Sequence, residues 1–470
     1  MVGKKRIVFC FDGSWNALDS GRPTNVVIVA QSVQPYVGGN MAQVIHYDDG
    51  VGTGGGDWKW MRAFDRWTGG IFGWGALDNI REAYRFLIFN YEVGDEIFVF
   101  GFSRGAYTAR SFIGLLRCAS IPRRRHAGQI GKAIEFYRNR KRGGQEHETA
   151  LFRFRADHSD DLVIDDKEED WRRANVPNYA GAKPGRLKVR FVGVWDTVGA
   201  LGLPAGLPGS ARFNGRHQFH DPELPDFVEF GRHAVAIDER RRTFAPTLWT
   251  NADARNVAMG ADPADPLAPV QERWFPGTHG SVGGGGDVLG LSDGALVWVM
   301  EGARQAGLEL DVTGLSRVYA IKPNFRDPVV NVRAGPDRAS KLLLKKDRNG
   351  PTVAHQVHLS AVCRWAEPAD ALAEGKEYRP PALQQIDMAA LAAQLPPRYT
   401  GPLQAHHVVA QGETLSEIAK LHYGSADFAA ILQANYCLLG GDPNQVYVGQ
   451  TLVIPLRPAR ESGAGPAPTP

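Results

Sequence analysis

The sequence predicts an α/β protein in which a mostly parallel sheet is covered by helices on both faces, followed by a small βααβ domain. Strand and helix patterns alternate from residue 5 to about residue 120, as they do in parallel sheets. A strand, a tight glycine-flanked turn and a helix follow one another around Ser103. A second core pattern with its own turn signals begins at residue 406, beyond a stretch rich in Ala and Pro.

The elements of the first 120 residues are predicted from apolar periodicity. Residues 50–56 are rich in glycine and are expected to form a loop, because no lysine follows them with the spacing of a phosphate-binding loop. The expected elements are strands at 6–11, 43–47 and 96–100 and helices at 24–34, 76–91 and 106–116.

Beyond residue 120 the composition and the apolar pattern change several times along the chain. A charged segment at about 123–185 is interpreted as a surface insertion, and residues 199–225 as a loop or lid beside a cleft. Further strands are expected at 187–195 and 272–275, and a helix at about 292–307. The predicted domain limits are 1–385 for the large domain, 386–405 for a linker, 406–456 for the small domain and 457–470 for a disordered tail.

Composition excludes several classes of protein. The chain has 470 residues, of which 43% are hydrophobic, so it can bury a sizeable core. Its formal net charge of +3 is too weak to indicate nucleic-acid binding. No segment reaches the ~18 apolar residues of a membrane span, and the apolar run 7–11 is too short for a signal peptide. The 4 cysteines lack C-x-x-C spacing, which predicts neither a zinc site nor a disulfide and fits synthesis in a reducing cytoplasm.

The turn Gly101-Phe-Ser-Arg-Gly105 has the pattern of a G-x-S-x-G nucleophile elbow. Glycines are needed there because a Cβ would collide with the neighbouring strand or helix. Such an elbow presents the Ser103 hydroxyl at the carboxyl edge of the sheet. The N–H of Arg104, at the start of the next helix, would then face a developing oxyanion.

A serine nucleophile needs a histidine base and a carboxylate, and in α/β-hydrolases these follow in the order Ser, Asp, His. Asp196 directly follows the predicted strand 187–195, and His279 follows the strand 272–275 through a short loop. We therefore predict the triad Ser103, Asp196 and His279 in an α/β-hydrolase-like fold. The competing bases are His233 and His358, and the competing acids are Asp238 and Asp287.

The second oxyanion donor is expected from the loop after the first strand. Gly13 and Ser14 are the candidates, because glycine allows close approach of the backbone. An ordinary β-turn explains the same residues equally well, so the two alternatives stay open from the sequence.

Several segments resemble the first Tle family of type VI secretion phospholipase effectors. The similarity covers about residues 4–381. Its segments are Phe11-Asp-Gly-Ser-Trp-Asn16, Tyr47-Asp-Asp-Gly-Val-Gly-Thr53, Gly101-Phe-Ser-Arg-Gly105, Gly193-Val-Trp-Asp-Thr-Val-Gly199, Phe275-Pro-Gly-Thr-His279, Val357-His-Leu-Ser360 and Tyr378-Arg-Pro-Pro381. The resemblance implies an enzyme that cleaves acyl esters of phospholipids with Ser103, Asp196 and His279. One departure is that Ser281 stands where the family usually has an aspartate.

The C-terminal segment 406–456 reads as strand, helix, helix, strand. Thr414 and Glu417 have the spacing of a capping box, and Leu415, Ile418 and Ala419 form an apolar face. The Gln-Gly-Glu-Thr-Leu and Val-Gly-Gln-Thr-Leu-Val-Ile-Pro segments resemble a LysM domain, which implies binding to N-acetylglucosamine glycans such as peptidoglycan. By that resemblance the glycan groove includes Gly412, Glu413 and Thr414; docking on a partner protein is the alternative.

These observations predict a phospholipase held on the cell wall of a target bacterium. We expect synthesis in the bacterial cytoplasm without a signal peptide, and export by a type VI system to the target periplasm. Expected partners are membrane phospholipid, peptidoglycan, and a spike and an immunity protein; no cofactor or metal is expected. The alternatives are a general carboxylesterase or lipase, and a non-catalytic wall-binding adaptor on a decayed hydrolase fold.

Overall fold

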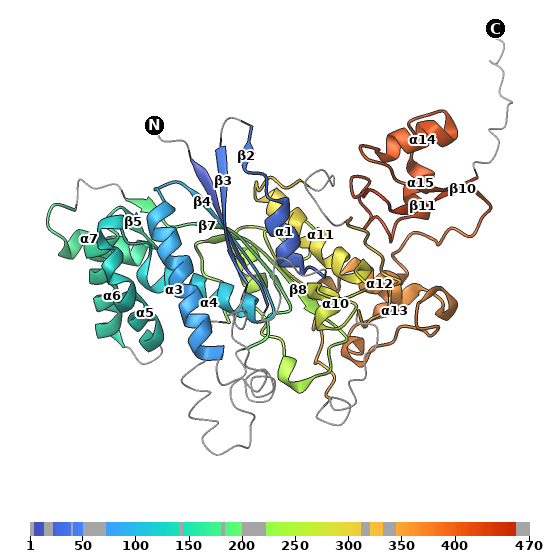
Figure 1. The fold of residues 1–470 in the computed structure, drawn as a ribbon. Coiled ribbons are helices and arrows are strands. Elements are labelled where there is room, and N and C mark those ends of the chain that lie inside the picture. The colour runs from blue at the N-terminus through green and yellow to red at the C-terminus, as the bar shows by residue number, and fades with distance from the viewer. Residues whose placement is uncertain are drawn as a thin grey trace, which may run out of the picture.

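The computed structural model describes residues 4–13, 22–38, 41–49, 72–140, 144–179, 184–199, 222–311, 320–331 and 345–456. Within these residues the centre is a seven-stranded sheet in the order β2-β3-β1-β4-β7-β8-β9 (Figure 1). Its strands are β1 (Lys5–Phe11), β2 (Tyr36–Val37), β3 (Met41–Asp48), β4 (Glu96–Phe102), β7 (Val189–Trp195), β8 (Val228–Ala236) and β9 (Val270–Phe275). Every neighbouring pair is parallel except β2 with β3. The predicted fold class is confirmed.

Helices cover both faces of this sheet (Figure 1). On one face lie α3 (Phe72–Asn90) and α4 (Arg104–Ala119), and on the other lie α1 (Asn25–Ser32) and α11 (Gly290–Gln305). The side chains of β1 alternate between the two resulting cores. Ile7, Phe9 and Phe11 face α3 and α4, whereas Val8 and Cys10 face α1 and α11. A strand buried on both faces therefore reads as an unbroken apolar run.

The register brings the carboxyl ends of four strands to one edge. Phe102 of β4 pairs with Trp195 of β7, and Ala236 of β8 pairs with Phe275 of β9. Ser103, Asp196 and the loop that carries His279 directly follow these ends. Parallel pairing therefore places the three predicted triad positions at the same rim, as expected for ligand sites of α/β sheets.

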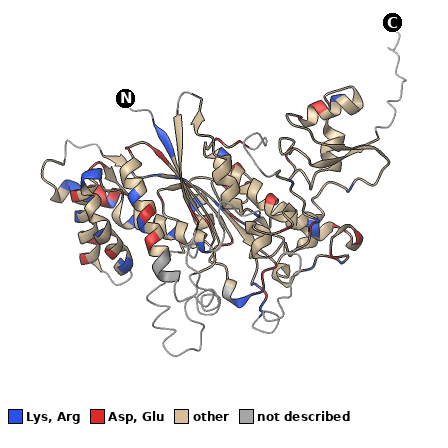
Figure 2. Cartoon of the chain, viewed as in Figure 1, with Lys and Arg blue, Asp and Glu red and all other residues tan. Residues whose placement is uncertain are grey.

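The charged segment 123–185 is mostly helical. It contains η1 (Arg124–Gln129), α5 (Ile130–Asn139), α6 (Gln145–His158), β5 (Leu162–Val163), α7 (Asp166–Asn175) and β6 (Gly185–Arg186). Lys and Arg residues alternate with Asp and Glu residues along its helices (Figure 2). Inside it, Glu168 forms an ion pair with Arg155 at 3.0 Å and accepts a hydrogen bond from Arg172 at 2.5 Å, and all three side chains are buried. A fixed ion cluster thus joins α6 to α7.

A third core cluster lies beyond β9. It includes Trp274 of β9 and buried residues of α12 (Leu359–Ala366), η8 (Pro381–Leu383) and α13 (Met388–Ala392). The short helices η6 (Ala354–Gln356) and η7 (Ala369–Ala371) precede α12 and η8 in the chain. Residues 386–405 were predicted to form a linker, but the first part of this range forms α13 and packs in the third core cluster. Asp387 caps α13 by accepting from the N–H of Ala390, and Met388 packs in the cluster with 4% of its surface exposed. An Ala- and Leu-rich run after an Asp cap forms a packed helix here.

The small domain consists of β10 (Leu403–Val408), α14 (Leu415–Tyr423), α15 (Ala429–Ala434) and β11 (Thr451–Pro455). The two strands are antiparallel, and a core of its own includes Leu415, Ile418 and Ile454. The predicted capping box is confirmed, since the Thr414 side chain accepts from the N–H of Glu417 and the Glu417 carboxylate accepts from that of Thr414.

The expectation that the cysteines form no disulfide is wrong. Cys363 of α12 is bonded to Cys437, which follows α15, with an S–S distance of 2.07 Å. Tyr447 of the small domain also packs in the second core cluster, which is the core between the sheet and helices α1 and α11. The small domain is therefore fixed to the large one by a covalent bond and by the packing of Tyr447. The other two cysteines, Cys10 and Cys118, are buried and take no part in the disulfide.

Some predictions fall on parts of the chain outside the described residues. These are the glycine-rich loop 50–56, residues 200–221 of the expected lid, Ser14, and the tail 457–470. Over the described ranges, no helix combines the length and apolar character that crossing a bilayer requires.

Candidate active site

The turn after β4 holds Ser103 in a conformation that few residues adopt. Its φ is 59° and its ψ is −121°, a strained geometry expected of a nucleophile elbow. A Cβ on Gly101 would lie 2.7 Å from the Cα of Ala106, and a Cβ on Gly105 would lie 2.1 Å from the carbonyl oxygen of Phe11. Both glycines are therefore required by close backbone packing, which the sequence predicted.

His279 is the first residue of α10 (His279–Gly283), four positions beyond the end of β9. Its Nε2 lies 2.8 Å from the Ser103 Oγ, and its Nδ1 lies 2.5 Å from the Asp196 Oδ2. Its main-chain N–H donates to the Glu239 carboxylate at 3.2 Å. The structure thus brings all three predicted triad residues into one hydrogen-bonded chain.

Two aromatic rings fix the plane of the imidazole. Phe102 lies 4.7 Å from the His279 ring centroid, and Phe244 meets the same ring edge-on at 4.8 Å. Because only 6% of the surface of His279 is exposed, its ring cannot rotate freely toward solvent. The histidine is held in place before any substrate arrives.

Asp196 is completely buried and has a φ of 38°. Burial alone would raise the pKa of its carboxyl, but the positive charge of Arg348, with a further contribution from His279, holds the pKa well below its usual range. Asp196 is therefore ionised and can only accept hydrogen bonds. It follows that Nδ1 of His279 carries the proton, and that Nε2 accepts from the Ser103 hydroxyl.

Arg348 is the residue of this site that the sequence did not reveal. Its guanidinium donates to both oxygens of Asp196, at 2.6 Å and 2.9 Å. Arg348 lies between stretches without an apolar period, 152 positions from its partner, and no motif marks it. Only the folded chain identifies it.

The predicted oxyanion donors are only partly in the expected arrangement. Arg104 is the first residue of α4, so its main-chain N–H lies at the helix N-terminus beside Ser103. The N–H of Gly13, however, donates to the Asp12 carboxylate at 2.6 Å. Asp12 in turn accepts from Thr24 at 2.7 Å and from Tyr47 at 2.9 Å. The Gly13 turn lies beside the elbow, but its donor is bound within the turn itself.

The competing bases each have other partners. His233 contacts the Glu272 carboxylate at 2.8 Å and accepts from the N–H of Thr197 at 3.3 Å. His358 accepts from Ser360 at the start of α12 and stacks on Phe275 with centroids 3.9 Å apart. Neither imidazole is in contact with Ser103.

The competing acids are also engaged elsewhere. Asp238 accepts from the N–H of Gly277 at 2.6 Å and from the Tyr378 hydroxyl at 2.8 Å. Asp287 pairs with Arg22 at 2.6 Å. Asp196 is thus the carboxylate that contacts His279 through its ring nitrogen.

Ser281 occupies the position at which the resembled family has an aspartate. Its hydroxyl donates to the carbonyl oxygen of Val329 at 2.7 Å, and the N–H of Thr278 donates to the same oxygen at 2.9 Å. The loop carrying His279 is therefore attached to residue 329 despite the substitution.

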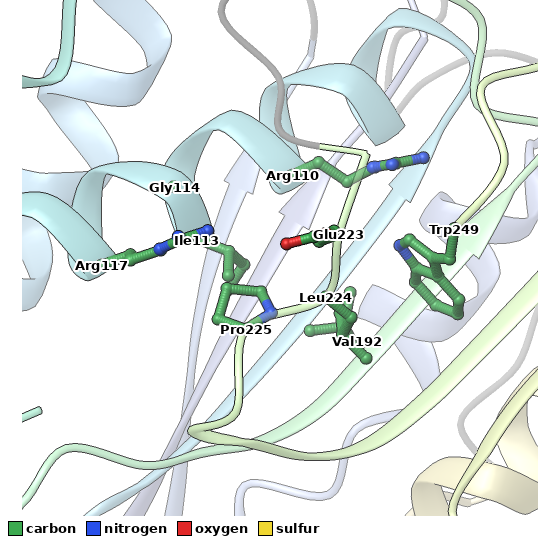
Figure 3. Close-up of a pocket in the computed structure, with 9 residues that line it drawn as sticks. All are labelled: Arg110, Ile113, Gly114, Arg117, Val192, Glu223, Leu224, Pro225 and Trp249. Atoms are coloured by element: carbon green, nitrogen blue, oxygen red, sulfur yellow. The ribbon is translucent and has the colours of Figure 1, made fainter. Parts of the chain in front are cut away.

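A hollow along α4 is separate from the triad. Arg110 and Arg117 of α4 face Glu223 and Trp249 across it (Figure 3). Its lining includes none of the triad residues. Across the described ranges, no cluster of His, Cys, Asp or Glu side chains could hold a metal ion.

In the small domain, the three residues predicted for glycan binding form the loop that opens α14. Gly412 (φ of 81°) and Thr414 are exposed, and Glu413 is half-buried. The Glu413 carboxylate accepts from His407 at 2.8 Å and from the N–H of Ala410 at 2.7 Å. The segment that follows α15 carries Cys437 and Tyr447.

Comparison with known proteins identifies two domains. The model of the family described as "T6SS, Phospholipase effector Tle1-like, catalytic domain" matches residues 5–302, and that of the LysM domain matches residues 407–455. The "Uncharacterized protein YEL023C" of Saccharomyces cerevisiae is 24% identical over 253 residues, 52% of this chain and 33% of that protein. The chain therefore spans about a third of the length of this curated relative.

Two solved structures are similar to parts of the chain. An uncharacterised protein from Pseudomonas aeruginosa is 18% identical, with a TM-score of 0.32, over 66% of this chain and 46% of that one. The structure of a Tle1 effector bound to the VgrG spike from the type VI secretion system is 19% identical, with a TM-score of 0.30, over 60% and 51%.

Proposed function

Because the chain belongs to the family of Tle1-like type VI secretion phospholipase effectors and also carries a LysM domain, we propose that it hydrolyses acyl esters of membrane phospholipids. The observation that carries this proposal is the hydrogen-bonded chain from Ser103 through His279 to Asp196. A serine activated in this way attacks ester carbonyls, because the imidazole takes up the hydroxyl proton as the new bond forms.

The reaction proceeds in two halves. The Ser103 oxygen attacks the acyl carbonyl while His279 accepts its proton at Nε2, giving a tetrahedral oxyanion beside the N–H of Arg104. His279 then returns the proton to the leaving lysophospholipid oxygen, which leaves an acyl-serine. Water attacks this ester by the same route and releases the fatty acid. Asp196 holds the imidazole in the correct tautomer and stabilises its protonated form.

The second oxyanion donor is proposed to come from Gly13 or Ser14. Gly13 adjoins the elbow, since a Cβ on Gly105 would lie 2.4 Å from the carbonyl oxygen of Asp12. Its N–H would serve an oxyanion after exchanging its bond to the Asp12 carboxylate for the substrate oxygen.

Substitution of the nucleophile tests the chemistry. Ser103→Ala is expected to abolish fatty-acid release from phosphatidylethanolamine vesicles and labelling by a fluorophosphonate probe, while far-UV circular dichroism stays unchanged. Ser111→Ala is the matched control, because Ser111 is a buried serine on the same helix α4. Hydrolysis of short esters without phospholipid cleavage would favour a general esterase. An unlabelled wild-type Ser103 would favour the decayed fold.

We further propose that the LysM domain binds peptidoglycan through the loop at Gly412, Glu413 and Thr414. The exposed position of this loop supports the proposal. The full chain should sediment with purified sacculi and be released by soluble N-acetylglucosamine oligomers. Sedimentation that the oligomers do not reduce would instead indicate docking on a protein.

Family membership and the disulfide also support a proposal on location. A type VI effector crosses from a reducing cytoplasm into the periplasm of a target cell, where disulfides form and persist. The bond between Cys363 and Cys437 fits that destination. A spike protein for export and an immunity protein in the producing cell are the corresponding proposed partners.

A further inference from the structure

Arg348 makes four hydrogen bonds around the carboxylate of the triad. Its Nη1 donates to the Asp196 Oδ1 at 2.6 Å and to the carbonyl oxygen of Ala236 at 2.7 Å. Its Nη2 donates to the Asp196 Oδ2 at 2.9 Å and to the carbonyl oxygen of Phe244 at 2.6 Å. The side chain is 4% exposed, so these bonds lie in a largely water-free environment.

These contacts join three segments that surround His279. Asp196 directly follows β7, Ala236 ends β8, and Phe244 belongs to η4 (Arg242–Phe244). The Phe244 ring is one of the two rings packed against the imidazole. One guanidinium therefore holds both the carboxylate that orients His279 and an aromatic wall beside it.

The backbone around Arg348 is itself held firmly. The N–H of Lys346 donates to the carbonyl oxygen of Arg240 at 2.8 Å. Gly350 has a φ of 76°, and a Cβ there would lie 1.7 Å from the carbonyl oxygen of Ala382. Because only glycine fits this contact, the segment is closely packed on η8. The guanidinium thus approaches Asp196 from a fixed position.

We propose that Arg348 is a positioning residue of the serine hydrolase, which fixes the plane of the Asp196 carboxylate and shares its negative charge. The inference rests on the proposed function. A bidentate guanidinium allows one carboxylate orientation, and that orientation directs Oδ2 at the Nδ1 of His279. Since Oδ2 accepts from both residues, Arg348 neutralises part of the negative charge that faces the His279 ring.

The other charged groups near His279 do not neutralise the charge of Asp196. Glu239 accepts from its main-chain N–H, and the charge of Glu239 is paired with Arg241 at 2.8 Å. Asp238 is directed away from the imidazole, toward Gly277 and Tyr378. Arg348 is thus the cation that contacts the carboxylate of the His279–Asp196 pair.

The experiment compares Arg348→Met and Arg348→Lys with Arg364→Met. Arg364 is the matched control because it is equally buried, donates to the carbonyl oxygens of Phe325 and Asp327, and pairs with Glu374. The substrate is a soluble p-nitrophenyl ester, which requires the nucleophile but no membrane. The readouts are kcat, KM, the pH profile of kcat/KM, and the far-downfield proton resonance of the hydrogen bond between His279 and Asp196.

We expect Arg348→Met to lower kcat about 10–100-fold, as substitutions of supporting residues do, with KM changed by less than about twofold. The acid limb of the pH profile should move to higher pH, because an unshared Asp196 charge favours protonated His279. Arg348→Lys keeps the charge but loses the fork, so the acid limb should return toward wild type while kcat stays reduced. Arg364→Met should leave the acid limb unmoved.

An unshifted acid limb in Arg348→Met, or an equal shift in Arg364→Met, would overturn the proposal. Should Arg348→Met fail to fold, an unchanged kcat in Arg348→Lys overturns it equally well. Failure of the proposed function is distinguishable, since a chain that cleaves soluble esters but not phospholipid still gives all these readouts. If the wild-type chain cleaves neither, the proton resonance decides, and an identical resonance in wild type and Arg348→Lys would refute the role.

Discussion

Breaking the bond between Cys363 and Cys437 should loosen the LysM domain while leaving the catalytic domain folded. The two cysteines are separated by 74 residues, and they join α12 to the segment after α15. The LysM core is small, with Leu415, Ile418 and Ile454 among its buried residues. A unit of about 50 residues is marginally stable alone, so a covalent attachment contributes a large fraction of its stability.

The magnitude follows from the length of the closed loop. In the chain-entropy description, a loop of 74 residues corresponds to about 4 kcal/mol of stabilisation at 25 °C, most of it through the unfolded state. The contact of Tyr447 with the second core cluster remains after reduction. We therefore expect the free energy of local opening of the LysM domain to fall by up to about 4 kcal/mol.

The assay separates the two domains. All 11 tryptophans precede residue 366, so tryptophan fluorescence in urea reports only the catalytic domain. Hydrogen exchange read by mass spectrometry over residues 403–456 reports the LysM domain. Cys437→Ser and a reducing agent should each accelerate exchange there and leave the fluorescence transition nearly unmoved. Cys118→Ser is the matched control, because Cys118 is not part of the disulfide.

Two results would refute this reasoning. One is the titration of four reactive thiols in the denatured, unreduced protein, since the disulfide predicts two. The other is equal exchange over residues 403–456 in the oxidised and reduced chains.

Three further substitutions have defined outcomes. Gly105→Ala places a Cβ 2.1 Å from the Phe11 carbonyl oxygen and should lower the free energy of unfolding, measured in urea, by about 1–3 kcal/mol. Gly128→Ala is the control and should lower it far less, because a Cβ there has no atom within 4 Å. Equal losses in the two variants would contradict the packing argument. Burial lowers the pKa of His358 to about 3, so its imidazole is protonated more readily in the unfolded chain and the free energy of unfolding decreases as the pH falls below about 6.5. His358→Asn should reduce this loss of stability between about pH 6.5 and 5. An unchanged pH dependence of stability in that variant would contradict the prediction. Thr414→Ala removes the capping box and should destabilise α14 by about 1 kcal/mol, read as faster exchange over residues 415–423, while unchanged exchange would mean that the cap contributes nothing.

The parts of the fold that the sequence predicted are those with local causes. The elbow around Ser103 is recognisable because strand, glycines and helix are adjacent in the chain. Asp196 and His279 could be predicted because each follows a strand end, and parallel strands bring such ends to one edge. The strand β8 was missed, since Gly231, Arg232 and His233 interrupt its apolar pattern even though all three are buried.

The features that the sequence did not reveal depend on distant partners. Arg348 is an ordinary charged residue until it meets Asp196 across 152 positions. The cysteine pair has no motif, because its geometry depends on how the LysM domain lies against α12. The hydrogen bond between the Gly13 N–H and the Asp12 carboxylate joins neighbouring residues. The position of that carboxylate, however, is fixed by hydrogen bonds from Thr24 and Tyr47, which are distant in the sequence.

The candidate active site is not complete within residues 5–302, the part of the chain that the catalytic family model matches. That segment contains Ser103, Asp196 and His279, but the guanidinium that pairs with Asp196 and the carbonyl oxygen that anchors the His279 loop come from residues 348 and 329. A buried carboxylate without its cation is strongly disfavoured, so a chain ending at residue 302 would bury an unpaired charge or lose the ionised form of Asp196. Residues 329 and 348 therefore supply contacts on which the geometry and charge of the candidate triad depend, and we expect substitutions there to alter the proposed catalysis as well as stability.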